Sequence, residues 1–393
     1  MNPQAALLRN PAVALAPTED GYLAYDIRSA QLHRLNAAAA LIIELCDGTQ
    51  TTDDIIAQVS TFIPGEGAEA GCRAWIDSAL ESGLLKAIAP GDPLPEAPAL
   101  TEFTGLANTL RKQGQVLAAF VCQHYAVYEM SEPDADDWDA LAVLAHIVGR
   151  REDAREAYER YLELDPDDAE VEHILVSLRD EAPPARASDK AITQLYERFA
   201  EFYEKNMVTD LEYKGPERLA EALRLHLGEP SDRRLDVLEL GVGTGLAGRH
   251  LRPRAKRLVG IDLSPEMLEH AKATGCYDAL DVAEITAWLA RPGMTTFDLI
   301  VACDTLIYFG DLRQVLVPAA KHLRSGGTLA FTVERGDGES FKLTDSGRYA
   351  HSEAHIRAAA ADAGLSVASV GEAVIRWEYG HEVVGLVTVL RRP

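Results

Sequence analysis

The chain has 393 residues, of which 47% are hydrophobic and 25% charged, and its formal net charge is −24 at pH 7. This length and composition predict a globular protein with more than one core, and they exclude a disordered or fibrous chain. Because binding to the phosphate backbone needs Lys and Arg to displace counterions, the acidity also argues against a nucleic-acid partner.

The N-terminal sequence and the cysteines indicate a compartment. The start, MNPQAALLRNP, has no basic region followed by a long apolar core, and no apolar run approaches the roughly 20 residues that span a bilayer. The five cysteines are scattered without a CxxC pair, as free thiols in a reducing compartment would be. We therefore expect a cytoplasmic protein without membrane contact and without a metal site.

Two stretches interrupt the apolar periodicity and are predicted to be linkers. Residues 89–97 (APGDPLPEA) are rich in Pro and acidic residues, and residues 181–190 (EAPPARASDK) carry a Pro pair that stops a helix. The sequence thus predicts three domains, at residues 1–90, 98–183 and 190–393.

The first domain begins with short alternating runs that predict strands near residues 13–16, 22–27 and 31–35. Helices follow these strands. Asn36 is predicted to cap the first helix and Thr52 the second, and the third runs over about residues 69–85.

This order of elements, with HRLNAAAALIIELCDGTQTTDDIIAQV at its centre, resembles the PqqD-like family, also called the RiPP recognition element, over about residues 8–88. The resemblance implies a winged-helix fold that holds the leader of a ribosomal precursor peptide. The leader would add a strand beside residues 31–35, with the third helix as the other wall of the groove. The alternatives are an edge buried against the neighbouring domain, and DNA binding, which the acids of the third helix (EAGCRAWIDSALESGLL) disfavour.

Residues 135–168 fit one 34-residue tetratricopeptide repeat, and helices over residues 106–130 and 170–178 are expected to pack against it. A single repeat cannot cover its own apolar face, so we interpret it as a spacer rather than a peptide-binding array. The residues on repeat positions are Trp138, Leu141, Gly149, Ala154, Tyr158 and Pro166.

From Leu235 the chain reads LDVLELGVGTGLAGRHL, an apolar strand that runs into glycines and then a helix. Gly241, Gly243 and Gly245 allow a tight turn and close approach of the backbone to a ligand. The spacing is E-x-G-x-G-x-G rather than the dinucleotide pattern G-x-G-x-x-G. Glu239 suits a cationic amino group and would repel a pyrophosphate, which favours S-adenosylmethionine (SAM).

The next strand, RLVGIDLS, ends at Asp262, where an acid can accept hydrogen bonds from both ribose hydroxyls, and Leu263 follows it. Farther on, Glu284 and Ile285 are predicted to bind adenine, the acid taking the exocyclic amine and the apolar side chain covering the ring. Asp281 is a competing choice for that acid.

The fourth strand, FDLIVACDTLIYFGD, places Asp304 just beyond its C-terminal end, where ligands bind in open parallel sheets. An acid that only caps a turn is the alternative. The fifth strand is TLAFTVE, and the last 29 residues, LSVASVGEAVIRWEYGHEVVGLVTVLRRP, predict a terminal antiparallel hairpin.

Residues 135–393 are similar throughout to the tetratricopeptide-containing class I methyltransferases. The resemblance rests on LYERFAEFYEKNMVTDLEYKGPERL, LELGVGTGLAGRHLRPRAKRLVGIDLSPEMLEHAKATGCYD and SGRYAHS. It implies a seven-stranded Rossmann-like α/β fold and SAM as cofactor. Because the PqqD-like segment departs from that family, the family's substrates do not carry over. The SAM motifs map onto Glu239, Gly241, Gly243, Asp262, Glu284 and Asp304.

The acceptor site is harder to predict, because methyl transfer needs alignment more than proton removal. The fourth strand lacks an NPPY amide-methylating motif. The candidates are Tyr308, His351 as general base and Arg348 as a clamp for a carboxylate. For His351 the alternative is a surface or cap histidine, and for Arg348 a pairing with the acidic scaffold. A helix with Tyr196, Phe199, Phe202 and Tyr203 is expected to cover the cofactor.

We therefore predict a methyltransferase that modifies a precursor peptide, with a carboxylate of the core peptide as the preferred acceptor. Backbone nitrogen, side-chain hydroxyl and carbon stay open as acceptors. A small-molecule methyltransferase with an N-terminal assembly domain and a non-catalytic peptide scaffold are the alternatives. The sequence also leaves open whether the chain forms a homodimer.

Overall fold

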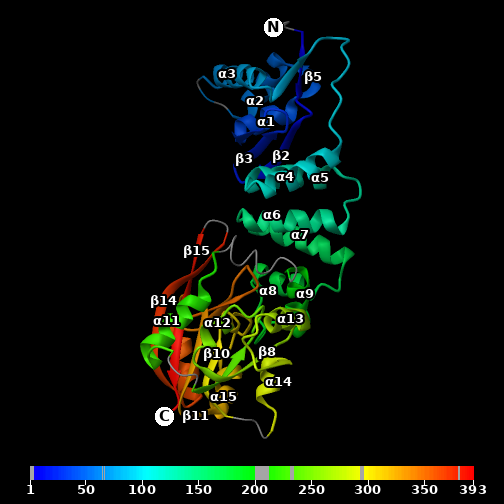
Figure 1. Ribbon diagram of the computed structural model, residues 1–393. Helices are drawn as coiled ribbons and strands as arrows, with labels where there is room; N and C mark the ends of the chain where they lie inside the picture. Colours follow the sequence, from blue (N-terminus) through cyan, green and yellow to red (C-terminus); the bar gives the residue numbers. More distant parts are fainter. Residues whose placement is uncertain are drawn as a thin grey trace. The chain divides into compact units, whose positions relative to one another are not determined.

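The computed structural model describes residues 4–63, 65, 67–199, 212–230, 234–292, 296–378 and 381–393. The chain forms two compact units, Met1–Pro166 and Asp167–Pro393 (Figure 1). The predicted division into three domains thus differs from the structure, in which the helical segment is shared between the two units.

The N-terminal unit contains two antiparallel three-stranded sheets. The sheet in the order β2-β3-β4 lies where the sequence predicts it, and the sheet in the order β5-β1-β6 was not predicted. The first sheet consists of β2 (Val13–Thr18), β3 (Gly21–Asp26) and β4 (Gln31–Asn36). The second consists of β1 (Ala6–Arg9), β5 (Asp47–Thr51) and β6 (Leu85–Ile88).

Three helices of this unit follow the predicted order, and their starts have clear causes. The side chain of Asn36 accepts a hydrogen bond from the backbone N–H of Ala39 at 3.0 Å. The second helix is capped by Thr51, one residue earlier than predicted, in a reciprocal capping box with Asp54. The helices are α1 (Ala37–Leu45), α2 (Thr52–Phe62) and α3 (Ala68–Glu81).

The helical segment between the predicted linkers belongs largely to the N-terminal unit. Helix α5 packs against β2 and β3, and Ala14 and Ala16 of β2 are 0% exposed. Because small side chains let a helix approach a sheet closely, this face is closed rather than left to a separate domain. The four helices are α4 (Leu100–Lys112), α5 (Val116–Glu129), α6 (Ala135–Ile147) and α7 (Arg151–Leu164).

The C-terminal unit contains one large sheet with the strand order β9-β8-β7-β10-β11-β15-β14. All neighbours in it are parallel except β15, which is antiparallel to both β11 and β14. This order confirms the predicted Rossmann-like α/β fold with a terminal hairpin. The strands are β7 (Leu235–Leu240), β8 (Ala255–Asp262), β9 (Ala279–Val282), β10 (Phe297–Ala302), β11 (Leu323–Arg335), β14 (Ser366–Glu378) and β15 (His381–Arg391).

A short strand pair extends this sheet beyond the prediction. β13 (Tyr349–His351) runs parallel to the end of β11 and antiparallel to β12 (Phe341–Leu343). This pair brings residues near His351 to the same end of the sheet as the predicted cofactor loop.

Helices pack around the sheet in two buried clusters. One cluster includes α11 (Gly215–Leu227) and α12 (Gly248–Leu251). The other includes α14 (Ile285–Leu289), α15 (Arg313–His322) and α16 (Glu353–Asp362). The remaining helices are α8 (Ala169–Leu178), α9 (Asp189–Phe199) and α13 (Pro265–Ala273). None of the described helices is long and apolar enough to cross a membrane.

The second predicted linker, residues 181–190, is a fixed part of the C-terminal unit. The N–H of Ala187 donates to the carbonyl of Tyr308 at 2.9 Å, and the N–H of Gly310 donates to the carbonyl of Ala185 at 2.9 Å. The Pro pair does stop helix continuation, but the extended chain that follows then pairs with this backbone. Part of the predicted linker therefore lies at the C-terminal end of β10, beside the predicted site.

Candidate functional site

The glycine loop after β7 has the conformation that its sequence requires. Gly241, Gly243 and Gly245 have φ values of 70°, 53° and 90°, in the left-handed region. A Cβ on Gly241 would lie 2.2 Å from Cγ2 of Thr305. Gly241 and Gly243 line a pocket, whereas a Cβ on Gly245 would lie 3.2 Å from Cα of Ala271 in α13. Gly245 therefore serves helix packing rather than the pocket wall.

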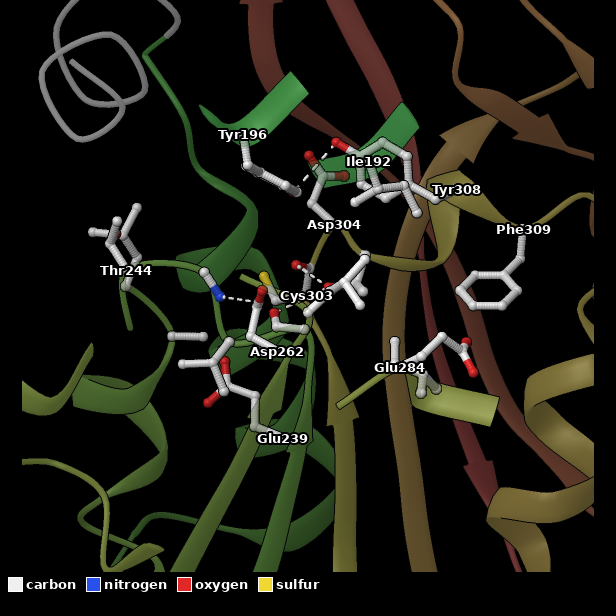
Figure 2. A pocket seen from close by; sticks show the side chains of 18 of the residues that line it. Ile192, Tyr196, Glu239, Thr244, Asp262, Glu284, Cys303, Asp304, Tyr308 and Phe309 are labelled. Atoms are coloured by element: carbon white, nitrogen blue, oxygen red, sulfur yellow. Dashed lines mark hydrogen bonds between the residues drawn. The ribbon is translucent and has the colours of Figure 1, made fainter. Parts of the chain in front are cut away.

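The pocket, of about 790 Å³, is lined by residues at the C-terminal ends of β7, β8 and β10 (Figure 2). This is the edge at which open parallel sheets bind ligands. Of the predicted site residues, Tyr203 lies outside the described residues, as does Phe202. Those that line the pocket are Tyr196, Glu239, Gly241, Gly243, Asp262, Leu263, Glu284, Ile285, Asp304 and Tyr308.

Asp262 ties the end of β8 to the glycine loop. Its Oδ2 accepts a hydrogen bond from the N–H of Gly243 at 2.8 Å, and its Oδ1 accepts one from the N–H of Ser264 at 2.9 Å. Burial raises the pKa of Asp262 above its ordinary value, against the effect of these hydrogen bonds. The carboxyl thus faces the pocket while it holds the loop in place.

Glu239 is the most deeply buried acid of the pocket, with 1% of its surface exposed. Its Oε2 accepts a hydrogen bond from the hydroxyl of Tyr277 at 2.9 Å. Burial raises the pKa of Glu239 to about 8, because the charged form loses its hydration. At pH 7 the free site therefore holds a proton on this carboxyl, and a bound cation would favour the carboxylate.

Glu284 and Asp281, the two competing choices for adenine, differ in position. Glu284 lines the pocket, and its carboxylate caps α14 through the N–H groups of Thr286 at 2.9 Å and Ala287 at 2.7 Å. Burial alone would raise the pKa of Glu284, but these hydrogen bonds lower it below its ordinary value. Asp281 is not among the lining residues and accepts from Nε1 of Trp288 at 2.9 Å. The geometry thus favours Glu284.

Asp304 and Tyr308 mark another part of the pocket. Asp304 has a φ of 53°, and its Oδ2 accepts a hydrogen bond from Arg376 at 2.8 Å. Its Oδ1 is buried and has no hydrogen-bond partner in the part of the chain that the structure describes. The hydroxyl of Tyr196 donates to the hydroxyl of Tyr308 at 3.3 Å. Figure 2 shows Asp304, Tyr196 and Tyr308 in one part of the pocket and Glu239 and Asp262 in another.

The structure places His351 away from the pocket. It is 0% exposed, and its Nε2 lies 2.8 Å and 3.1 Å from the carbonyl oxygens of Phe309 and Gly310. Burial lowers the pKa of His351 to about 4. The prediction of a general base therefore needs correction, because the side chain is fixed on backbone that closes the pocket and does not line it.

Arg348 is also separated from the pocket. Its guanidinium pairs with Glu378 and lies 3.8 Å from Glu334. It lines a second hollow, of about 390 Å³, which shares Tyr308 and Ile192 with the first. The prediction that Arg348 clamps an acceptor carboxylate is thus not supported, because its guanidinium lies outside the cofactor pocket and pairs through Nη1 with a glutamate of the scaffold.

Several lining residues escaped the sequence interpretation. Arg186 and Asp189 lie in the predicted linker and pair with each other at 2.6 Å. Thr244 and Thr305 stand beside motif residues and were detectable from that position. The buried Oγ1 of Thr244 has no hydrogen-bond partner. Other lining residues that were not predicted are Ile192, Tyr213, Pro216, Val242, Leu246, Ala247, Ala283, Cys303 and Phe309.

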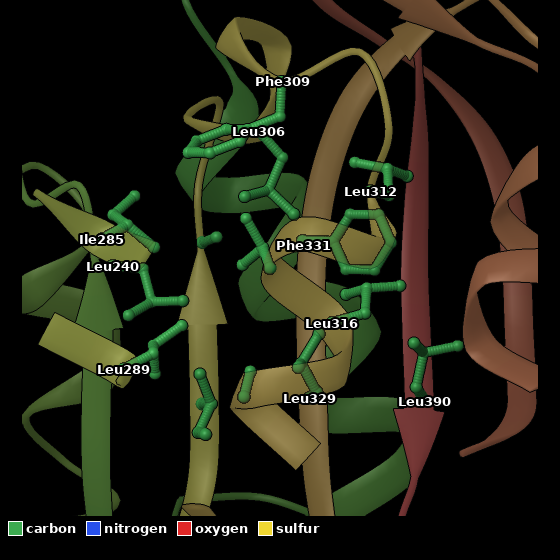
Figure 3. Close-up of a cluster of buried hydrophobic side chains, with 14 of the residues drawn as sticks. Leu240, Ile285, Leu289, Leu306, Phe309, Leu312, Leu316, Leu329, Phe331 and Leu390 are labelled. Carbon is green, nitrogen blue, oxygen red and sulfur yellow. The ribbon is translucent and has the colours of Figure 1, made fainter. Parts of the chain in front are cut away.

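Apolar packing fixes the base of the pocket. Ile285 and Phe309 line the pocket and also belong to the larger buried cluster, with Leu240 and Leu306 beside them (Figure 3). Shared packing of this kind limits movement of the pocket walls. The site is therefore largely preformed.

The residues present fit SAM. An adenosine with a cationic amino-acid part needs apolar cover, carboxylates for the ribose and amino groups, and further polar contacts, and Ile285, Asp262 and Glu239 match these needs. The unpartnered Oγ1 of Thr244 and Oδ1 of Asp304 give two more polar atoms in the pocket wall. In the part of the chain that the structure describes, no three His, Cys, Asp or Glu side chains form a metal site.

Comparisons with known proteins match two separate parts of the chain to two families. Residues 238–329 match the family described as "Methyltransferase domain". Residues 21–85 match the family described as "Coenzyme PQQ synthesis protein D (PqqD)". Part of the C-terminal unit is thus similar to methyltransferase domains.

Curated relatives of the chain include human methyltransferase-like protein 27, 30% identical over 35% of this chain and 56% of that protein. The malonyl-[acyl-carrier protein] O-methyltransferase of Acetivibrio thermocellus is 30% identical over 37% of this chain and 50% of that protein. The chain thus spans about half the length of these relatives.

Solved structures of similar fold include the N-methyltransferase NodS of Bradyrhizobium japonicum, in complex with S-adenosyl-l-homocysteine (SAH). It has a TM-score of 0.41 and 24% identity, over 51% of this chain and 98% of that one. The magnesium protoporphyrin IX methyltransferase of Synechocystis PCC 6803, with bound SAM, has a TM-score of 0.40 and 17% identity, over 53% of this chain and 100% of that one.

Proposed function

We propose that this protein is a SAM-dependent methyltransferase that modifies a ribosomally made precursor peptide, whose leader binds to the N-terminal unit. The observation that carries the enzymatic part is the joining of the glycine loop, Glu239 and Asp262 in one preformed pocket. The PqqD-like match over residues 21–85 supports the peptide part.

In this proposal a side chain is in place for the ribose, the amino group and the adenine of SAM. Asp262 accepts from the ribose hydroxyls, Glu239 pairs with the amino group, and Glu284 with Ile285 holds adenine. When bound, SAM supplies the methyl group on a sulfonium, which needs no metal to act as an electrophile. The chain's own task is to orient the acceptor and exclude water.

Strand β4 supports the peptide part of the proposal. Among the described residues β4 pairs with β3 alone, so its other edge offers backbone groups to an added strand. Leu32 on β4 is 41% exposed, so an added strand could contact its apolar side chain. A leader bound here would raise the effective concentration of the core peptide at the pocket. The tetratricopeptide-like helices α6 and α7 would then act as a spacer.

The test of the enzymatic part is a calorimetric titration of SAM into the full chain and into Asp262→Asn. The substitution keeps the size of the side chain but removes its charge, and we expect at least about tenfold weaker binding, as for loss of a charge-assisted hydrogen bond. Asp337→Asn is the control, since the side chain of Asp337 is 95% exposed. No binding to the unaltered chain would sink the enzyme proposal.

The test of the peptide part uses short peptides encoded next to the gene, incubated with SAM and followed by mass spectrometry. Leu32→Asp is expected to slow methylation of the true precursor while SAM binding stays unchanged. Leu225→Asp is the matched control, because Leu225 is 70% exposed and lies in the C-terminal unit. Equal methylation by both variants and the unaltered chain would contradict leader binding at β4.

A further inference from the structure

A buried ion network lies behind one wall of the pocket. Arg376 of β14 is 2% exposed and donates to Asp304 at 2.8 Å, to Glu378 at 2.8 Å and to Glu334. Arg348 pairs with Glu378 and also lies near Glu334. Three carboxylates thus share two guanidinium groups, and all three nitrogens of Arg376 donate to them.

The network leaves one acceptor atom unused. Arg376 holds Oδ2 of Asp304, whereas Oδ1 is buried without a hydrogen-bond partner among the described residues, and the side chain is 9% exposed. The residue also lines the pocket and has a φ of 53°. A non-glycine residue in this conformation is strained and persists where the surroundings hold it. An unpartnered buried carboxylate oxygen has a further cost unless a ligand donates to it.

The surroundings of this oxygen suit a donor and not an anion. Among the described residues, Arg186 is the only basic residue that lines the pocket, and it pairs with Asp189 at 2.6 Å. Arg348 and Arg376 are both shared among carboxylates. An acceptor carboxylate beside Asp304 would therefore meet a like charge without a free cation.

We propose that the methyl acceptor is an uncharged amine or a hydroxyl group that donates a hydrogen bond to Oδ1 of Asp304, and not a carboxylate. The lone pair of the acceptor would form the new bond to the methyl carbon as the bond from that carbon to the sulfonium sulfur breaks, which leaves SAH. The proton that the acceptor donates would pass to Oδ1 of Asp304. Arg376 is the positioning residue that presents this oxygen. The inference rests on the proposed methyltransferase function and narrows its substrate class. It replaces the carboxylate acceptor that the sequence favoured.

The second hollow indicates what kind of molecule bears the amine or hydroxyl group. It shares Ile192 and Tyr308 with the cofactor pocket, and a group of apolar side chains lines one part of it, namely Ile174, Ala187, Ala191 and Leu195. Its polar lining residues are Glu170, His173, Ser346 and Arg348. An acceptor that reaches Asp304 past Tyr308 would thus have an apolar body next to its donor group. A branched aliphatic amine or alcohol matches this combination.

The test uses the full chain saturated with SAH and three probes with the same apolar body: isopentylamine, isopentyl alcohol and isovalerate. Their affinities are measured by saturation-transfer NMR titration. We expect the amine or the alcohol to bind at least tenfold more tightly than isovalerate. Asp304→Asn keeps an oxygen for Arg376 and puts an NH₂ group in place of Oδ1. The variant should therefore lose that preference at least tenfold, as expected for a charge-assisted hydrogen bond.

The outcomes separate the two proposals. SAH binding is measured first, and its absence in the unaltered chain would overturn the methyltransferase function itself. If SAH binds but isovalerate binds as well as the amine and the alcohol, or neither of these binds, the inference about Asp304 is wrong while the function stands. An unchanged preference in Asp304→Asn would overturn it as well. Asp337→Asn is the control, and a far-UV circular-dichroism spectrum equal to that of the unaltered chain shows that Asp304→Asn is folded.

Discussion

The hydroxyl of Tyr277 donates a 2.9 Å hydrogen bond to Oε2 of Glu239, and this glutamate is 1% exposed. The hydrogen bond favours the carboxylate, but burial has the larger effect and raises the pKa of Glu239 to about 8. The free site thus stores a proton beside the glycine loop. This proton links the stability of the C-terminal unit, and its affinity for a cationic ligand, to pH.

The first prediction concerns the stability of the ligand-free protein. Between the ordinary pKa of 4.5 and about 8, folded Glu239 keeps a proton that the unfolded chain has lost. The contribution of Glu239 to the free energy of unfolding should therefore fall as pH rises through this window, and it should level off above about pH 8. In Glu239→Gln this pH-dependent contribution is absent. The melting temperature of the variant should therefore rise relative to that of the unaltered chain as the pH is raised from 5 to about 8.

The control for this comparison is Glu339→Gln, which makes the same chemical change at an exposed residue. Its melting temperature should follow that of the unaltered chain over the whole pH range. A constant difference between Glu239→Gln and the unaltered chain would show that Glu239 titrates in its ordinary range.

The second prediction concerns proton release on cofactor binding. If the amino group of SAM pairs with Glu239, binding at pH 7 should displace the stored proton into the buffer. Calorimetry in two buffers of different ionisation enthalpy measures the number of protons released. Glu239→Gln should bind more weakly and release fewer protons, while the titration of SAM itself is common to both proteins. Equal release from the two would place the proton on another group.

The third prediction concerns the glycine loop. Gly241→Ala would bring a Cβ to within 2.2 Å of Cγ2 and 2.4 Å of Oγ1 of Thr305, at a φ of 70°. Gly275→Ala is the matched control, because Gly275 has a φ of 67° with nothing within 4 Å of a Cβ. Backbone strain costs each variant about 1–3 kcal/mol of unfolding free energy. In Gly241→Ala alone, the clash of the new methyl group with Thr305 lowers the free energy of unfolding further. This variant should also bind SAM at least about tenfold more weakly.

Urea unfolding and SAM titration of the two variants measure these effects separately. A similar loss of stability in both, with SAM affinity intact, would mean that the loop accommodates the methyl group by a shift of Thr305.

The cofactor wall was predictable from sequence because it depends on local rules. Gly241 and Gly243 need left-handed backbone next to a strand end. Asp262 ends β8 and Asp304 follows the end of β10, and the C-terminal ends of parallel strands lie at one edge of the sheet. Glu284 starts the helix at the pocket edge, which agrees with the preference for it over Asp281.

The rest of the site depends on pairings between distant segments, which spacing does not encode. Arg376 reaches Asp304 from the terminal hairpin, and Arg348 is occupied by glutamates of two other strands. His351 is polar and lies near the sheet end, but its ring contacts backbone carbonyls. Residues 181–190 have the composition of a linker, and their role appears once they pair with residues 308–310.

The last prediction follows from that pairing. A chain that starts at residue 167 keeps the compact C-terminal unit, whereas one that starts at residue 190, the boundary expected from sequence, removes Arg186 and Asp189 from the pocket wall. It also removes the 2.7 Å hydrogen bond from the hydroxyl of Tyr349 to the carbonyl of Pro184 and the two backbone hydrogen bonds to residues 308–310. At about 1 kcal/mol for each hydrogen bond, these three contribute roughly 3 kcal/mol to the lost stability. The loss of helix α8, with its buried Val171 and Leu175, adds to this. The shorter chain should also bind SAM more weakly, because residues 308–310 lie at the pocket wall and lose the segment with which they pair.

Urea unfolding and SAM calorimetry of the two truncated chains test this prediction, with the full chain as reference. Equal stability and affinity of the two truncated chains would show that residues 181–189 act as a linker after all.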